Sequence, residues 1–338
     1  MDLNERSIQV LNEIVDMYTR TGQPVGSKTL AENLPMALSP ASIRNVMAEL
    51  EGRGLLMSPH TSAGRIPTEE GFRFFAHGLV EVGDLNTRLK DELKRRVDGA
   101  GSFDVAMQEV SRTLAQMSSC AGLVLAPRYN DATLRQVEFI RLGADKALVV
   151  LVSDTGAVEN RMIPVPPSLT DAELRTACAE LNQVVKGKTL AAAREQIIKT
   201  LREKKSALDS MMNTLFDAPS PNDTALMVGG SQNLFSYPEL VRERLHGLFE
   251  VFEEKRLLIG LLDQVRESEG VKVFIGAECP LEAARDCAMI TATYGTTDKR
   301  VVGTLGVIGP IRMDYRQSIA LVDYTARLLS RVLDDRLA

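Results

Sequence analysis

The sequence predicts an α+β protein with a helical N-terminal domain and a larger domain that an inserted segment interrupts. Three observations predict it. The chain has 338 residues, enough for two or three domains that each bury a core. Strand-like segments occupy about 120–165 and return after 270, and a strongly helical stretch, 169–216, lies between them. This order is typical of one α+β domain with an insertion, and two independent small domains are the alternative.

Composition narrows the class of protein. A hydrophobic fraction of 44% and a charged fraction of 25% are typical of globular proteins. A net charge of −5 excludes a polybasic coat protein but not a local DNA-binding face. Four scattered cysteines and three histidines argue for reduced thiols and against a zinc site. We therefore expect no metal, no cofactor and no catalytic residues. The polar N-terminus and the short apolar runs predict a cytoplasmic protein with no membrane contact.

The first fifty residues carry three helix patterns. Residues 5–21 have apolar residues at helical spacing, with Asn4 as the N-cap and Gly22 as the end. A turn at Pro24 and Gly26 follows, and Ser27 is expected to cap a short helix over 28–34.

The third helix carries the most information about function. Ser39 is a good N-cap, and Pro40 suits the first helical position. Stepping 100° per residue places one set of residues inside and another outside. Small residues on the outer face allow close approach, while Arg and Asn side chains read base edges. The inner set is Ile43, Val46, Met47 and Leu50, and the outer set is Ala41, Arg44, Asn45 and Ala48 with Ser42 and Glu49 at its flanks.

A hairpin pattern follows the third helix. Leu55–Met57 reads as a strand, 58–65 as a loop and Ile66 as the return strand. Gly64 is free to adopt a positive φ, and Arg65 is suited to enter a minor groove or to bind phosphate. Three helices and a hairpin in this order indicate a winged helix-turn-helix, although each piece alone is compatible with an ordinary solvated surface. The candidate DNA-binding residues are Lys28, Ser39, Ser42, Arg44, Asn45, His60, Thr61, Ser62, Gly64 and Arg65.

The charge of this region points to a dimer. Residues 1–80 hold seven basic and nine acidic residues, so a single copy neutralises few phosphates and binds DNA weakly. Two copies double the contacts and can read a palindromic duplex. The sequence therefore predicts a homodimer that binds double-stranded DNA.

The helical segment supplies a candidate dimer interface. Thr170 and Glu173 form a capping box at its start, and a second helix is expected over 189–216. Its apolar stripe either packs on its own domain or forms a subunit interface. The stripe consists of Leu190, Ile197, Leu201, Leu208, Met211 and Leu215.

Several motifs carry a family resemblance. The stretches PVGSKTLAENL (24–34), SPASIRNVMAELEGRGLL (39–56), PHTSAGRIPTEEGFRFF (59–75) and 303–333 resemble the HrcA family of bacterial heat-inducible transcription repressors. Departures are mild: Val46 stands where many relatives have an acidic residue, and Ile66 replaces a common valine. The resemblance implies a winged helix over 1–82, a GAF-like domain over 83–168 and 251–338, and an inserted helical dimerisation domain over 169–250.

The resemblance also implies a function. Members of the family bind the CIRCE inverted repeat upstream of groE- and dnaK-type chaperone operons and repress class I heat-shock genes, and the chaperonin GroEL modulates them. The alternative is a winged-helix regulator whose GAF-like domain binds a small-molecule effector. An enzyme is disfavoured because the second half lacks clustered titratable residues: Cys279 and Cys287 have no obvious base, and they are expected to be buried.

Overall fold

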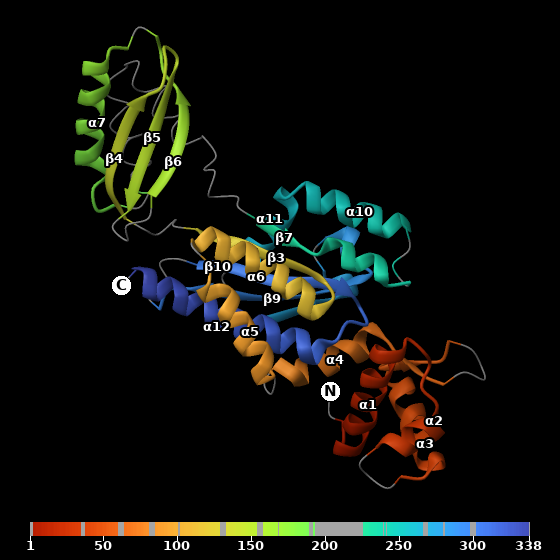
Figure 1. Ribbon diagram of the computed structural model, residues 1–338. Coiled ribbons are helices and arrows are strands. Elements are labelled where there is room, and N and C mark those ends of the chain that lie inside the picture. The colour runs from red at the N-terminus through yellow and green to blue at the C-terminus, as the bar shows by residue number, and fades with distance from the viewer. Residues whose placement is uncertain are drawn as a thin grey trace. The chain divides into compact units, whose positions relative to one another are not determined.

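The computed structural model describes residues 3–34, 38–59, 64–80, 85–100, 102–128, 133–153, 158–167, 169–188, 192, 226–238, 240, 242–265, 270–279, 281–297 and 302–337. The chain divides into two compact units, each described separately below (Figure 1). The larger unit comprises Met1–Val124, Met227–Thr293 and Thr304–Leu328, and the smaller comprises Leu125–Leu226, Tyr294–Gly303 and Leu329–Ala338.

The larger unit begins with the three predicted helices, α1 (Glu5–Thr21), α2 (Ser27–Asn33) and α3 (Pro40–Gly52). Asn4 caps α1 by accepting a hydrogen bond from the backbone N–H of Ser7, and Gly22 ends it with a φ of 66°. Ser39 caps α3 in the same way, through the N–H of Ser42. These caps confirm the predicted starts of α1 and α3, because a cap satisfies the free amides of a first turn.

The predicted wing follows α3. Strands β1 (Leu56–Met57) and β2 (Ile66–Pro67) pair antiparallel, and α4 (Glu69–Val80) comes next. The Thr68 hydroxyl accepts a hydrogen bond from the N–H of Gly71 at 3.1 Å and so caps the start of α4. The buried face of α4 carries Phe72, Phe75, Ala76 and Leu79. The N-terminal region is therefore a winged helix-turn-helix.

The rest of the larger unit is built on a five-stranded sheet in the order β7-β3-β10-β9-β8. Helices α10 and α11 appear on one side of this sheet in Figure 1, and α5 and α12 on the other. A Cβ at Gly122 of β3 would collide with the backbone oxygen of Ser111 in α6, so this glycine permits close packing of helix on sheet. The elements are α5 (Thr87–Asp98), α6 (Phe103–Ser118), β3 (Ala121–Arg128), β7 (Leu226–Gly229), α10 (Arg242–Glu253), α11 (Arg256–Val265), β8 (Val271–Ile275), β9 (Cys287–Gly295), β10 (Val302–Pro310) and α12 (Tyr315–Leu337).

The smaller unit contains an antiparallel sheet of β4 (Leu134–Arg141), β5 (Lys146–Ser153) and β6 (Val158–Pro164). Helix α7 (Asp171–Val185) begins with the predicted capping box of Thr170 and Glu173. The Asn182 side chain bonds both the N–H and the carbonyl of Val137, each at 2.7 Å, which anchors α7 to β4. The shared core of helix and sheet consists of Leu134, Val137, Ala147, Val149, Leu151, Ile163, Val165, Leu174, Leu181 and Val185.

The opposite face of this sheet carries an apolar row, and none of the described residues forms a core with it. Ile140, Leu148 and Met162 lie directly across from one another on the three strands. Ile140 is 49% exposed, Met162 is 62% exposed and Leu148 is half-buried. We call this set the open-face row.

Two expected domain boundaries need correction. Strands β4–β6 were expected in the first part of the interrupted domain, 83–168, but they form their own sheet and share a core with α7. The expected insertion, 169–250, also ends too late because β7 joins the five-stranded sheet. The insertion therefore lies between β3 and β7 and includes a sheet. Apart from Ala192, the second expected helix, 189–216, lies outside the described residues.

No helix in the described part of the chain has the length and apolar character needed to cross a bilayer.

Candidate nucleic-acid interface

Helix α3 separates an apolar face from a polar one. Its buried residues are Ile43, Val46, Met47 and Leu50, of which Ile43 and Leu50 have no exposed surface. Ala41, Arg44, Asn45 and Ala48 are all exposed. The predicted orientation of α3 is thus confirmed. A protruding face with small residues and two polar side chains suits a helix that enters a major groove.

The N-terminal end of this face is fixed by a contact with α2. Arg44 Nε donates a hydrogen bond to Ser27 Oγ at 3.2 Å. Ser27 was expected to cap α2, but it is the first residue of that helix, the N-cap is Gly26, and no side chain caps it. The Ser27 hydroxyl instead orients Arg44, beside the exposed Lys28. Sequence alone gives no signal for this contact because the two residues are 17 positions apart.

The hydroxyls at the start of α3 also lie near this face. Ser39 is exposed and Ser42 is half-buried, and their Oγ atoms are hydrogen-bonded at 3.0 Å. Together with Arg44 and Asn45 they form a polar surface on the first two turns of α3, where helix-turn-helix proteins contact base edges.

The wing is held at its base. Arg65 and Val25 exchange two backbone hydrogen bonds of 2.9 Å, which fixes the return strand against the turn between α1 and α2. A Cβ at Gly64 would collide with the Val25 carbonyl, so close backbone approach requires this glycine. The expected wing residues His60, Thr61 and Ser62 lie outside the described residues.

The Arg65 side chain binds the end of α3. Its Nε lies 2.9 Å and its Nη2 lies 2.8 Å from Oε2 of Glu51. The side chains of Arg65 and Glu51 are 27% and 35% exposed. Glu51 was not among the predicted site residues, and a helix-end carboxylate gives no sequence signal for a partner in a distant loop.

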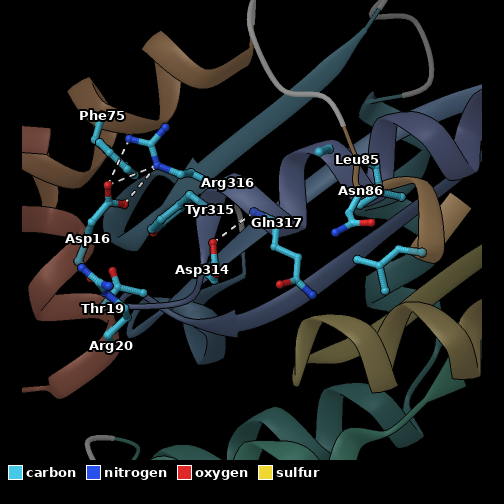
Figure 2. Close-up of a pocket in the computed structure, with 12 residues that line it drawn as sticks. Asp16, Thr19, Arg20, Phe75, Leu85, Asn86, Asp314, Tyr315, Arg316 and Gln317 are labelled. Atoms are coloured by element: carbon cyan, nitrogen blue, oxygen red, sulfur yellow. Dashed lines mark hydrogen bonds and ion pairs between the residues drawn. The ribbon is translucent and has the colours of Figure 1, made fainter. Parts of the chain in front are cut away.

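The winged helix contacts the C-terminal part of the larger unit through α1 (Figure 2). Arg316 at the start of α12 binds the Asp16 carboxylate through Nε at 3.1 Å and Nη2 at 3.1 Å, and its guanidinium lies over the Phe75 ring. Arg312 Nη1 donates to the backbone oxygen of Thr19 at 3.1 Å. Beside these contacts is a cavity of about 520 Å³, also lined by Asn86 and Gln317 among others.

A second contact joins α4 to the turn after β8. Glu69 Oε2 accepts a hydrogen bond from the N–H of Ala277 at 3.3 Å, and Arg73 Nε lies 2.9 Å from Glu278. Gly276 has a φ of 60°, and a Cβ there would collide with the Glu69 carboxylate. The two contacts together fix the position of the winged helix within the larger unit.

Three of the four cysteines are buried in the larger unit, and their thiols are poor nucleophiles. Cys120, Cys279 and Cys287 are buried, and Cys178 is half-buried. Burial raises the pKa of Cys120 and of Cys287 to about 12. Thiols with such a high pKa are poor nucleophiles, in line with the buried positions expected for Cys279 and Cys287.

The six residues predicted for dimerisation, Leu190, Ile197, Leu201, Leu208, Met211 and Leu215, all lie outside the described residues.

Comparison with known proteins matches both halves of the chain. Residues 2–77 match the family profile described as "Winged helix-turn-helix transcription repressor, HrcA DNA-binding", and residues 104–319 match "HrcA protein C terminal domain". Similar curated proteins include the heat-inducible transcription repressor HrcA of Mesorhizobium japonicum, which is 42% identical across 98% of this chain and 95% of that protein. The protein of the same name from Geobacter sulfurreducens is 38% identical across 98% of this chain and 99% of that protein.

A solved structure shares the fold. The protein described as "Crystal structure of a hypothetical protein at 2.2 A resolution" superposes with a TM-score of 0.63 at 22% identity, covering 99% of this chain and 100% of that chain.

Proposed function

This chain belongs to the HrcA family of heat-inducible transcription repressors, and from that premise we propose that it binds the CIRCE inverted repeat as a homodimer. Bound there, it represses groE- and dnaK-type chaperone operons, the class I heat-shock genes, by occupying their promoters. Its DNA-binding part is the winged helix-turn-helix. We further propose that it acts in the cytoplasm without catalytic activity, and that GroEL modulates it.

The observation that carries this proposal is the outer face of α3. Arg44 and Asn45 are exposed opposite a fully packed inner face. Among the described residues, Arg44 is bound through its Nε atom alone, by Ser27. Its terminal nitrogens are therefore available to contact a guanine, and the Asn45 amide can contact an adenine.

The other predicted residues extend this surface. Ser39 and Ser42 supply hydroxyls at the start of α3, and the exposed Lys28 on α2 is suited to bind a phosphate. The wing adds His60, Thr61 and Ser62 as candidate DNA contacts, and Gly64 and Arg65 form the base of the wing. We infer that α3 reads the bases and that α2 and the wing contact the backbone and the minor groove.

Two observations support a dimer. The winged helix carries no excess of basic residues, so one copy has little electrostatic affinity for DNA. The open-face row of Ile140, Leu148 and Met162 is apolar and accessible, as is typical of surfaces that another protein covers. We propose that this sheet face and the stripe over 190–215 together form the subunit interface. We also propose that each protomer has a GAF-like domain that carries its winged helix.

An electrophoretic mobility shift with a labelled CIRCE duplex tests the proposal. The full-length protein should bind this duplex at least roughly a hundredfold more tightly than a scrambled duplex of the same length. Arg44→Ala should weaken specific binding by roughly a hundredfold, because each of two protomers loses a base contact of about 1–3 kcal/mol. Light scattering should show that the variant has the same mass as the wild type.

Arg53→Ala is the matched control. Arg53 lies beyond the other end of α3 and is paired with Glu49 at 2.9 Å, so its loss removes the same charge without removing a base contact. Equal weakening by the two substitutions would show that Arg44 contributes only charge. Equal affinity of the wild type for the two duplexes would refute sequence-specific binding.

A further inference from the structure

Arg65 is bound at both its backbone and its side chain. The backbone exchanges two hydrogen bonds with Val25, which is 3% exposed in the turn between α1 and α2. The side chain places Nε and Nη2 within 2.9 Å of one carboxylate oxygen of Glu51 near the end of α3. Arg65 therefore connects three elements: the return strand of the wing, the α1–α2 turn and α3.

The first strand of the wing is fixed differently from the second. Leu55 N–H bonds to the carbonyl of Leu50, so the chain leaves α3 directly into β1. After the loop, the Thr68 hydroxyl donates to the Gly54 carbonyl at 2.6 Å. The Arg65–Glu51 pair is a further side-chain contact that joins the return strand to the end of α3.

The two arginines of the interface differ in which atoms remain available. Within the part of the chain that the structure describes, Arg44 is held only through Nε. Arg65 uses its Nε and Nη2 atoms on Glu51, and this is one of the two edges through which a guanidinium makes bidentate contacts with phosphate or guanine. Binding DNA through that edge would break two charge-assisted hydrogen bonds and leave the Glu51 carboxylate unpaired near a polyanion.

We propose that Arg65 is a positioning residue that fixes the wing relative to α3 by binding Glu51, and that it does not itself contact DNA. The inference rests on the proposed operator binding and assigns a role to one predicted residue within it. It also assigns Glu51 a role: an acidic side chain near DNA repels phosphates, but here it orients the wing.

The substitution Glu51→Gln distinguishes positioning from direct contact by the sign of its effect. The substitution removes a negative charge and weakens the hold on Arg65. A direct DNA ligand freed from its carboxylate would bind more tightly and with a steeper dependence on salt. A positioning residue that loses its partner would weaken specific binding, by roughly tenfold, without a steeper salt dependence.

The exchange variant Glu51→Arg with Arg65→Glu provides an independent test. It keeps the net charge and restores an ion pair of reversed polarity, but it places a carboxylate where the arginine was. We expect it to bind the CIRCE duplex within a few-fold of the wild type, whereas Arg65→Glu alone should lose roughly a hundredfold or more. Circular dichroism and light scattering of each variant establish that it is folded and has the mass of the wild type.

Both measurements use the full chain, with CIRCE and scrambled duplexes titrated at several salt concentrations. Weaker binding by Glu51→Gln together with recovery in the exchange variant supports the proposal. Unchanged or tighter binding by Glu51→Gln, or an exchange variant as weak as Arg65→Glu, overturns it. Failure of the wild type to prefer the CIRCE duplex would instead count against the proposed function.

Discussion

Two exposed surfaces of this protein have opposite chemistry. The outer face of α3 carries Arg44 and Asn45 between small residues, whereas the open-face row of the three-stranded sheet carries Ile140, Leu148 and Met162. Water hydrates a polar face favourably until DNA replaces it. Covering an apolar face with protein is favourable by about 25 cal/mol of free energy for each Å² removed from water. In the proposed function, DNA binding and pairing with a second subunit therefore belong to separate units of the chain.

The largest effect is expected at the open-face row. Met162→Asp should weaken self-association by roughly a thousandfold, because a charge replaces an apolar side chain and a two-fold interface contains it twice. Sedimentation equilibrium over a range of concentrations measures the change. Gln183→Asp, on the exposed side of α7, introduces the same charge away from the row and should not alter association.

Operator binding connects this prediction to the outer face of α3. If DNA binding requires the dimer, Met162→Asp should also weaken binding to the CIRCE duplex at low protein concentration, and a high protein concentration should restore binding. Tight operator binding by a monomeric Met162→Asp protein would contradict the proposal that two winged helices must bind together.

A second, smaller effect is the pH dependence of stability, which comes from two buried cysteines of the larger unit. Cys120 and Cys287 have a folded pKa of about 12 against an ordinary value of 9.0. Because the folded pKa is the higher one, their contribution to stability is complete below pH 9 and is lost as pH rises toward 12. Each thiol should remove on the order of 1.4 kcal/mol from the free energy of unfolding for each pH unit in this range.

Urea unfolding between pH 8 and pH 10.5 measures this loss of unfolding free energy, and Cys287→Ala should make its slope with pH shallower.

The half-buried Cys178, in the smaller unit, should react with a thiol reagent at neutral pH before the three buried cysteines. Simultaneous reaction of all four thiols would contradict the assigned burial, and an unchanged pH slope in Cys287→Ala would contradict the assigned pKa.

The smallest effect is expected at the contact between α1 and α12. Arg316 and Asp16 have side chains that are 50% and 29% exposed, so solvent screens much of their attraction. Arg316→Ala should cost about 1 kcal/mol, including its contact with Phe75. A double-mutant cycle with Asp16→Asn, measured by thermal unfolding, should give a coupling below this value, and NMR signals of α3 should not move.

The sequence predicted local structure well and non-local structure poorly. Asn4, Ser39 and Thr170 cap the helices they were expected to cap because an N-cap acts within three residues. The strands over 134–164 were also correctly recognised, but they were assigned to the wrong domain. Alternating apolar residues indicate that a strand has a buried face, and they do not indicate which strand will pair with it.

The candidate site shows the same division. The inner and outer faces of α3 followed from helical spacing alone. The partners of Arg44 and Arg65, which are Ser27 and Glu51, come from residues 17 and 14 positions away, and no periodicity in the sequence specifies such contacts. Gly64 was predicted to matter because glycine can adopt a positive φ, but its φ is not in that region. The structure requires a glycine there for another reason, because a side chain would collide with the carbonyl of Val25.

The pairing of Asp16 with Arg316 joins residues that are 300 positions apart, and this has a consequence for biosynthesis. At about 5–20 residues per second, a ribosome takes roughly 15 to 60 s to translate the chain between them. For most of that interval the winged helix has been synthesised, but Arg312 and Arg316, which bind it, have not. A chain that ends early, through premature termination or a frameshift near the 3′ end of the message, would therefore have a winged helix that lacks these contacts.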